Sequence, residues 1–183
     1  MPDQTSSVLM WIDLEMTGLD VQLDVIVEIA AIATDTELNV LDEGIDVVVH
    51  QSDDVLATMV DVVKSMHEKS GLTAEIRSSP LGLEEAGART LEYIKGHIPK
   101  ARTVPLCGNS IGTDRRFLDR YLPEIENHLH YRSIDVSTFK ELCKLWYPEA
   151  YAAMPNKQQG HRALADIRES IEELRYYRRA MLR

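Results

Sequence analysis

The chain has 183 residues, of which 44% are hydrophobic and 27% charged, and its formal net charge is −10. This size and composition are ordinary for a globular protein, and we expect a single domain over residues 1–183. A protein that wraps long duplex nucleic acid relies on many contacts between basic side chains and phosphates, so the acidic balance argues against that class of partner. A short anionic substrate remains compatible, because a metal ion and a few local arginines can hold it.

The N-terminus and the apolar segments give no sign of secretion or membrane insertion. The first seven residues lack the basic and apolar regions of a signal peptide, and Glu28 interrupts the best candidate for a membrane span. Cys107 and Cys143 have no metal-binding spacing and lie in apolar or helical surroundings. We therefore expect a cytoplasmic protein with two reduced core thiols and no membrane association.

Three closely spaced apolar segments open the chain and predict strands. They cover residues 8–15, 25–34 and 45–50, and a hairpin connection over 35–44 joins the last two. Connections this short favour an antiparallel meander. Apolar residues at helical spacing then predict one helix over 53–69 and another over 83–97.

The second half of the chain alternates strands and helices. Strands are predicted at 103–108 and 131–136, and helices at 112–122, after the fifth strand, and from about 162 onward. Thr138 and Glu141 have capping-box spacing, so Ser137 or Thr138 is expected to cap the helix after the fifth strand. The order of elements predicts an α/β fold with a mixed five-stranded sheet, antiparallel in its first three strands and completed by parallel strands, with helices packed on it.

Two acids lie within the first predicted strand. Strand side chains alternate between faces, so Asp13 and Glu15 point the same way and lie a few ångströms apart. Two carboxylates on a buried face repel each other and lose hydration, which costs free energy. A divalent cation that prefers oxygen ligands, Mg²⁺ or Mn²⁺, can compensate for this cost. A strand end that reaches solvent would instead leave both acids hydrated, and a three-residue pattern does not decide between these alternatives.

Three further polar residues lie near predicted helix starts. Asp114 follows the fourth strand, and an acid that interacts favourably with the helix dipole is a sufficient explanation for it alone. His161 and Asp166 are five positions apart, which on one helix would separate them by about 140°. They converge only if His161 precedes the helix, on the loop that Gln159 and Gly160 provide. Taken singly, a loop histidine and a first-turn acid are ordinary features.

Together these residues supply four carboxylates and one imidazole from elements that are far apart in the sequence. Such a set suits phosphodiester hydrolysis by two metal ions about 4 Å apart, which activate a water and stabilise the leaving oxygen. An imidazole that titrates near neutrality is a suitable acceptor for the proton of that water. The combination therefore indicates a metal-dependent phosphodiesterase, although no residue of the set would do so alone.

Three segments of the chain resemble the motifs of the DEDDh 3′-to-5′ exonucleases, which have a ribonuclease H-like fold: Asp13-Leu14-Glu15, Asp114, and His161 to Asp166. Longer segments are similar to the oligoribonuclease family in particular, namely 13–19, 108–111, 131–138 and 161–170. The resemblance spans nearly the whole chain. Asp135 competes with Asp114 as the third acid, and the Gly-Asn-Ser context favours Asp114.

The resemblance implies hydrolysis of very short RNA, especially dinucleotides, to mononucleotides from the 3′ end. It implies that Asp13, Glu15 and Asp166 hold one divalent ion, Mg²⁺ or Mn²⁺. Asp13 with Asp114 would hold a second ion, directly or through water, and His161 would be the general base.

The resemblance also implies substrate-binding residues. Leu19 matches an apolar wedge against a base, and Tyr131 matches a base-stacking aromatic that the other subunit of a homodimer contributes. A polar cluster that holds the 5′ phosphate is matched by Ser110, Arg132, Ser137 and Thr138. Hydroxyls and a guanidinium form a compact anion site, and a closed end would leave a longer chain nowhere to continue. Each of these residues also has an ordinary alternative. Leu19 could be a turn-flanking core residue and Tyr131 an edge-strand aromatic. Ser137 and Thr138 could be helix caps only, and Arg132 could form a surface ion pair.

Two other functions compete with this interpretation. A DNA-directed exonuclease of the same superfamily would be expected to have an extended basic groove, which the net charge of −10 opposes. A catalytically silent nucleotide-binding module is disfavoured because all five catalytic-type residues are present. The chain departs from the family at 60–65, where a tryptophan is common. His67 is expected on a helix surface, near the cleft at most, and Glu28 in a supporting role at most.

Overall fold

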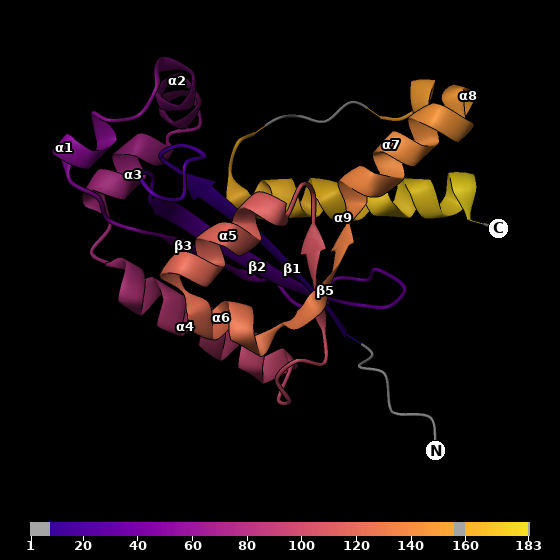
Figure 1. Ribbon diagram of the computed structural model, residues 1–183, viewed down its shortest axis with the longest axis horizontal. Helices are drawn as coiled ribbons and strands as arrows, with labels where there is room; N and C mark the ends of the chain where they lie inside the picture. The colour runs from indigo at the N-terminus through magenta and orange to yellow at the C-terminus, as the bar shows by residue number, and fades with distance from the viewer. Residues whose placement is uncertain (1–7, 156–159, 183) are drawn as a thin grey trace.

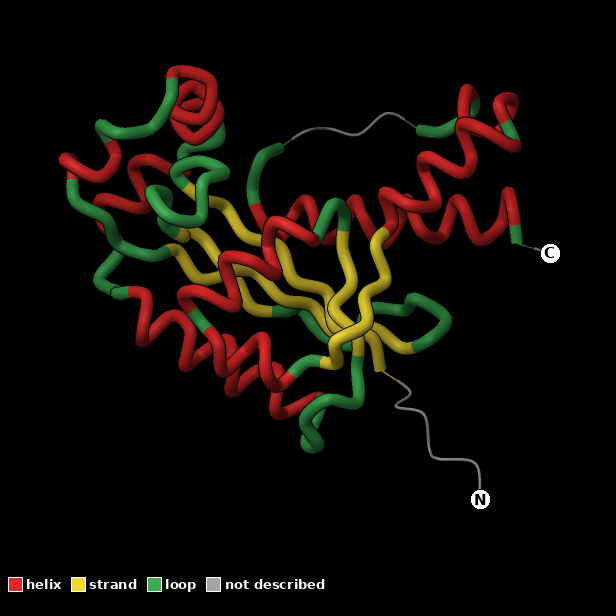
Figure 2. The backbone as a smooth tube through the Cα atoms, viewed as in Figure 1, coloured by secondary structure: helices red, strands yellow, loops and turns green. Residues whose placement is uncertain are grey.

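A mixed five-stranded sheet lies at the centre of the computed structural model, which describes residues 8–155 and 160–182. The strands lie side by side in the order β3-β2-β1-β4-β5 (Figure 2). β1 and β3 both pair antiparallel with β2, whereas β4 pairs parallel with β1 and β5, as the sequence predicts. The strand bounds are Val8–Met16 (β1), Ile26–Asp35 (β2), Ile45–Val48 (β3), Pro105–Gly108 (β4) and His130–Asp135 (β5).

Helices cover both faces of this sheet. α4, α5 and α6 pack on one face and α7 and α9 on the other, while α1, α2 and α3 share a small separate core with β2 and β3 (Figure 1). None of the helices in the described ranges is long and apolar enough to span a membrane. The helix bounds are Asp53–Leu56 (α1), Asp61–Lys69 (α2), Leu72–Ser78 (α3), Leu83–His97 (α4), Gly112–Tyr121 (α5), Pro123–His128 (α6), Val136–Trp146 (α7), Pro148–Ala152 (α8) and Ala163–Met181 (α9).

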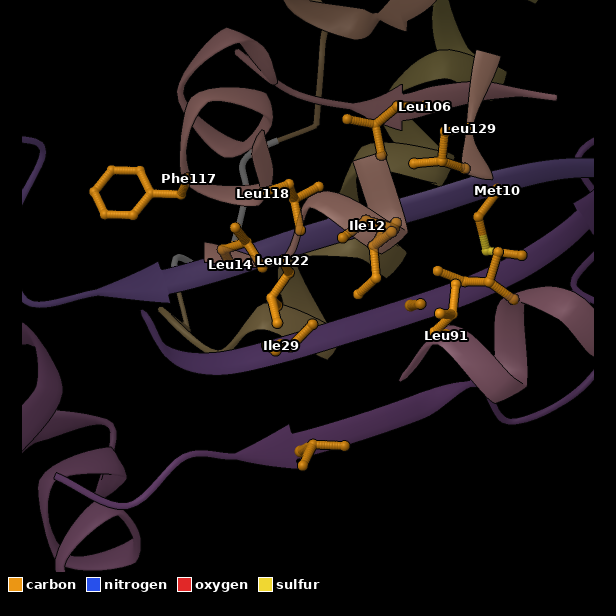
Figure 3. Packing of buried hydrophobic residues seen from close by; sticks show 14 of the residues in the cluster. Met10, Ile12, Leu14, Ile29, Leu91, Leu106, Phe117, Leu118, Leu122 and Leu129 are labelled. Atoms are coloured by element: carbon orange, nitrogen blue, oxygen red, sulfur yellow. The ribbon is translucent and has the colours of Figure 1, made fainter. Parts of the chain in front are cut away.

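The alternation of side chains along β1 determines which layer receives each residue. Met10, Ile12 and Leu14 are buried on the face that α4, α5 and α6 cover (Figure 3). Trp11 is fully buried on the opposite face, in the cluster that includes the apolar residues of α9. Positions 13 and 15 have the same parity as Trp11, so both acids of this strand point toward the layer of α9.

Local structure differs from the sequence prediction at several helices. The region predicted as one helix over 53–69 is divided into α1 and α2. The short helices α3, α6 and α8 have no counterpart in the prediction; they contain seven, six and five residues. Isolated helices of this length are unstable in water, so tertiary packing rather than local periodicity determines them. The predicted cap of α7 is also wrong, because Asp135 is the N-cap and its carboxylate accepts a hydrogen bond from the backbone N–H of Ser137.

Candidate active site

Three of the predicted metal ligands meet at the carboxyl end of β1. Asp13 and Glu15 lie on the face of β1 that α9 covers, and Asp166 is in the first turn of α9. One carboxylate oxygen of each residue lies within 4.8 Å of the other two. The pleat of the strand and the packing of α9 on the sheet thus bring acids from both ends of the chain to one point.

Asp114 reaches the same strand from α5, which follows β4. Its side chain is in the first turn of α5, and the residue is 7% exposed. Its Oδ1 accepts a hydrogen bond of 3.1 Å from the backbone N–H of Leu14. Because β4 ends at Gly108 and its pairing with β1 stops at Trp11, this carboxylate serves as an acceptor beyond the point where β4 pairs with β1.

Burial and mutual repulsion disfavour the ionised forms of these acids. Burial is the main cause that raises the pKa of Asp13 well above its ordinary value, and the negative charge of Asp114 is the next. Burial, followed by the charge of Asp166, raises the pKa of Glu15 to about 8. Burial also raises the pKa of Asp114 to about 6. The fold therefore concentrates negative charge at this point, and the charge of Arg162 opposes the rise in the pKa of Glu15 only in part.

The donor atoms of this cluster fit a hard divalent cation. All are carboxylate oxygens, which Mg²⁺ and Mn²⁺ prefer. With ligand distances of about 2.1 Å, two oxygens on one Mg²⁺ ion lie roughly 3 to 4 Å apart, and those of Asp13, Glu15 and Asp166 all lie within 4.8 Å of one another. A bound cation would also reverse the unfavourable charge balance, because it stabilises the ionised carboxylates.

The metal-free protein is expected to lose stability as the pH rises from about 4.5 to about 8. A carboxyl with a raised pKa holds its proton more tightly in the folded state than in the unfolded chain, so a higher pH favours unfolding. For Glu15 the loss begins near 4.5 and is complete above about 8. Thermal melts in a chelator over this range measure the slope. Saturating Mg²⁺ or Mn²⁺ should flatten it, and an identical slope with and without the ions would contradict the assignment of the cluster as a cation site.

His161 lies on the segment directly before α9, which begins at Ala163. It is therefore off the helix, as its angular separation from Asp166 requires. The φ of His161 is +47°, in the left-handed region that few non-glycine residues adopt, and the residue is partly buried. Gln159, which is predicted to form part of this loop, lies outside the described residues.

The residues predicted to contact bases are exposed. Leu19, in the loop after β1, is 70% exposed, and Tyr131, on the edge strand β5, is 74% exposed. Leu19 is therefore not the core residue that the alternative interpretation requires. The guanidinium of Arg132 lies over the ring of Tyr131, 5.6 Å from its centroid, so these two predicted substrate residues share one surface.

Asp135 organises two of the four residues predicted to hold a phosphate. Its Oδ1 accepts hydrogen bonds from the backbone N–H of Ser110 at 2.9 Å and from the hydroxyl of Ser137 at 2.6 Å. Thr138 follows on α7 and borders a groove of about 410 Å³. The charge of Asp135 adds to the effect of burial in raising the pKa of Asp114, so Ser110 and Ser137, which donate to Asp135, lie near that acid. Asp135 itself is engaged as a helix cap.

Two buried polar residues lie beside the cluster, and the prediction of a surface position for His67 is wrong. His67 is 1% exposed; its Nε2 lies 2.8 Å from the carbonyl oxygen of Met16 and its Nδ1 3.9 Å from Oε2 of Glu15. The helical periodicity gives no signal for this, because His67 packs against the end of β1. Glu28 is fully buried and stands opposite Glu15 in the register of β1 and β2. The predicted meander does not specify this register, so the sequence alone does not show that Glu28 lies opposite Glu15.

This fold and this cluster together define a class of enzyme. A mixed sheet of this order, with acids contributed by β1, α5 and α9, is the arrangement of an exonuclease with a ribonuclease H-like fold. Residues 10–174 match the family model of the RNase_T exonucleases, so the chain belongs to that family and is a nuclease.

Comparison with individual relatives identifies the subgroup of this family to which the chain belongs. The chain is 58% identical over 171 residues to the oligoribonuclease of Rhodococcus jostii, covering 93% of this chain and 86% of that one. It is 55% identical over 171 residues to the oligoribonuclease of Mycobacterium ulcerans, covering 93% and 80% of the two chains. Within the RNase_T exonucleases, its family is thus that of the oligoribonucleases.

A solved structure shows the same fold at low identity. E. coli exonuclease I in complex with a dA16 oligonucleotide superposes with a TM-score of 0.72 and 17% sequence identity. The match covers 96% of this chain and 41% of the exonuclease I chain, so this chain spans about two fifths of that protein.

Proposed function

We propose that this chain is a 3′-to-5′ exoribonuclease that hydrolyses very short oligoribonucleotides, especially dinucleotides, to nucleoside 5′-monophosphates. The observation that carries the proposal is the convergence of Asp13, Glu15 and Asp166 at the end of β1 in a relative of named oligoribonucleases. The family match over 10–174 supports one domain over residues 1–183, and we place the activity in the cytoplasm.

The acids have separate roles in the proposed site. Asp13, Glu15 and Asp166 would hold one divalent ion, and Asp13 with Asp114 a second, Mg²⁺ or Mn²⁺ in each case. When bound, the two ions activate a water and stabilise the leaving oxygen of the phosphodiester. The hydrogen bond from Leu14 fixes the orientation of the Asp114 carboxylate at the end of β1.

His161 would accept the proton of the attacking water. Its place on the loop before α9 brings an imidazole next to the helix that carries Asp166. The residue is only partly buried, so water can reach it. A positioned general base of this kind contributes about 10²- to 10⁴-fold to a rate.

The substrate would lie between exposed apolar residues and a closed polar end. Leu19 would contact one base, and Tyr131, contributed by the partner in a homodimer, would stack on another. The 5′ phosphate would be held by Ser110, Arg132, Ser137 and Thr138. A phosphate enclosed in this way leaves no path for a longer 5′ extension, which accounts for the proposed preference for dinucleotides.

The proposal is tested by comparing kcat/KM for a 5′-phosphorylated diribonucleotide with the values for RNA and DNA of roughly 20 nucleotides. We expect the diribonucleotide to be favoured by at least about tenfold, because only its 5′ phosphate reaches the polar end. A preference for the long DNA would instead identify a DNA exonuclease, the alternative that the fold shared with E. coli exonuclease I raises.

The same experiment includes an arginine variant and a matched control. Arg132→Gln should lower kcat/KM for the phosphorylated diribonucleotide by about 10- to 100-fold, the value of a lost charged hydrogen bond of about 1.5–3 kcal/mol, and should barely affect a substrate without the 5′ phosphate. Arg120 stacks on Tyr121 in the same manner, at 5.4 Å, so Arg120→Gln controls for the loss of a stacked cation. Equal effects of Arg132→Gln on both substrates would contradict the phosphate assignment.

A further inference from the structure

Arg162, the residue after the proposed general base, is held between two acids. Its Nε donates to Oε1 of Glu28 on β2 at 2.8 Å. Its two terminal nitrogens donate to the two carboxylate oxygens of Glu75 on α3, each at 2.8 Å. A planar guanidinium is suited to such a fork, because its five donors have fixed directions. One side chain thus joins β2, α3 and the start of α9.

Glu28 makes a second contact that fixes α9 itself. Its Oε2 accepts a hydrogen bond of 2.9 Å from the backbone N–H of Ala163, the first residue of α9. The N-cap residue of α9, Arg162, provides no side-chain cap, so Glu28 serves that purpose from another strand. Glu28 is fully buried, so both interactions lie in a region of low dielectric where they are strong.

Arg162 and Glu28 are both next to residues of the proposed site. Arg162 is preceded by His161, and its carbonyl oxygen accepts the N–H of Asp166 at 2.9 Å in the first turn of α9. Glu28 is the cross-strand partner of Glu15. The same few residues therefore connect the strand pair that carries two acids with the helix start that carries the third acid and the histidine.

We propose that Glu28, Arg162 and Glu75 form a positioning clamp that sets the start of α9 against β1 and so aligns His161 and Asp166 with Asp13 and Glu15. The proposal rests on the function proposed above. Stability alone does not explain the clamp, because apolar residues of similar volume often replace a buried ion pair without loss. Here the buried acid also adds negative charge beside Asp13 and Glu15, and its charge further raises the pKa of both.

The clamp predicts a weaker metal site and a slower enzyme in Glu28→Gln and Arg162→Gln. Glutamine at position 28 can still accept the N–H of Ala163 but loses the charge that holds Arg162. Loss of such a supporting partner costs about 10- to 100-fold in metal affinity or activity. We expect kcat for the diribonucleotide to fall within that range while KM changes by less than about threefold, because no substrate contact is removed. Mn²⁺ binding, measured by electron paramagnetic resonance of the free ion, should weaken in parallel.

Two further variants control for charge and folding. Arg168→Gln removes an ion pair of the same helix, to Glu43 at 3.3 Å, and should leave kcat and Mn²⁺ binding unchanged. Arg162→Lys keeps the charge but cannot reach both acids, so it should recover part of the loss seen in Arg162→Gln. If Glu28→Gln does not fold, Glu75→Gln is the test, since Glu75 is 48% exposed.

The outcomes separate the clamp from the function. Clamp variants that melt earlier yet retain wild-type kcat and Mn²⁺ affinity would show a purely structural role and overturn the proposal. If wild-type protein hydrolyses no oligoribonucleotide while the clamp variants still bind Mn²⁺ more weakly than Arg168→Gln, the proposed function fails and the clamp stands.

Discussion

The Asp13→Asn variant is expected to lose at least about 100-fold in kcat/KM for a diribonucleotide and, when metal-free, to melt at a higher temperature than the wild-type protein. Asp13 is the acid that the proposed site assigns to both metal ions. Removal of a supporting partner of a ligand already costs about 10- to 100-fold, so the loss of a shared ligand should exceed that range. Asparagine keeps the shape of the side chain, removes its charge and replaces one of its two acceptor oxygens by an NH2 group.

The gain in stability follows from the surroundings of Asp13. Burial, with the charges of Asp114, Glu15 and Asp166, raises the pKa of Asp13, which means that its ionised form destabilises the folded state. A neutral amide at this position avoids that repulsion. The difference in melting temperature should be largest above a pH of about 8, where Glu15 is ionised as well.

Both effects are measurable on one pair of proteins. Thermal melts in a chelator give the stability, and initial rates with Mg²⁺ or Mn²⁺ give the activity. Asp119→Asn, at an exposed position of α5, should change neither. An Asp13→Asn protein that keeps more than about a tenth of wild-type activity would show that the site is elsewhere. A metal-free variant that melts below wild type would contradict the charge balance inferred for the cluster.

The mixed sheet and the relative positions of the main site residues could be predicted from the sequence, because they depend on short-range geometry. Strand alternation places Asp13 and Glu15 on one face, and the structure adds that Trp11 defines that face as the one under α9. The five-residue spacing from His161 to Asp166 requires the histidine to precede the helix, and α9 begins at Ala163. The mixed sheet follows from the lengths of the connections.

What the sequence could not supply depends on partners that are distant along the chain. Arg162 donates to Glu28 and Glu75, which are 134 and 87 positions away, and no local pattern marks such pairs. The burial of His67 likewise depends on how α2 sits against the end of β1. The sequence does not identify Asp135 as the cap of α7, because Ser137 and Thr138, which follow it closely, are equally plausible caps. The misjudged features are those in which a polar side chain has a tertiary partner.

The His161→Asn variant is expected to lose on the order of 10²-fold or more in kcat for the diribonucleotide, with little change in KM. A general base acts on the proton of the water in the transition state, so its removal lowers kcat and leaves substrate binding intact. Asparagine is the appropriate substitution, because the φ of His161 is +47° and asparagine tolerates the left-handed region, whereas alanine would add strain.

The pH dependence distinguishes a base from a residue that only shapes the loop. A neutral imidazole that accepts a proton gives a rate that rises with pH before it levels off, and this rise should be absent from the residual activity of His161→Asn. Mn²⁺ binding should be unchanged, because the proposed ligands are the carboxylates. His97, which pairs with Asp42 on the far side of the sheet, is the matched control, and His97→Asn should keep the wild-type profile. If His161→Asn retained both its rate and its pH profile, the water would lose its proton to some other group, and the segment before α9 would have to be assigned a structural role.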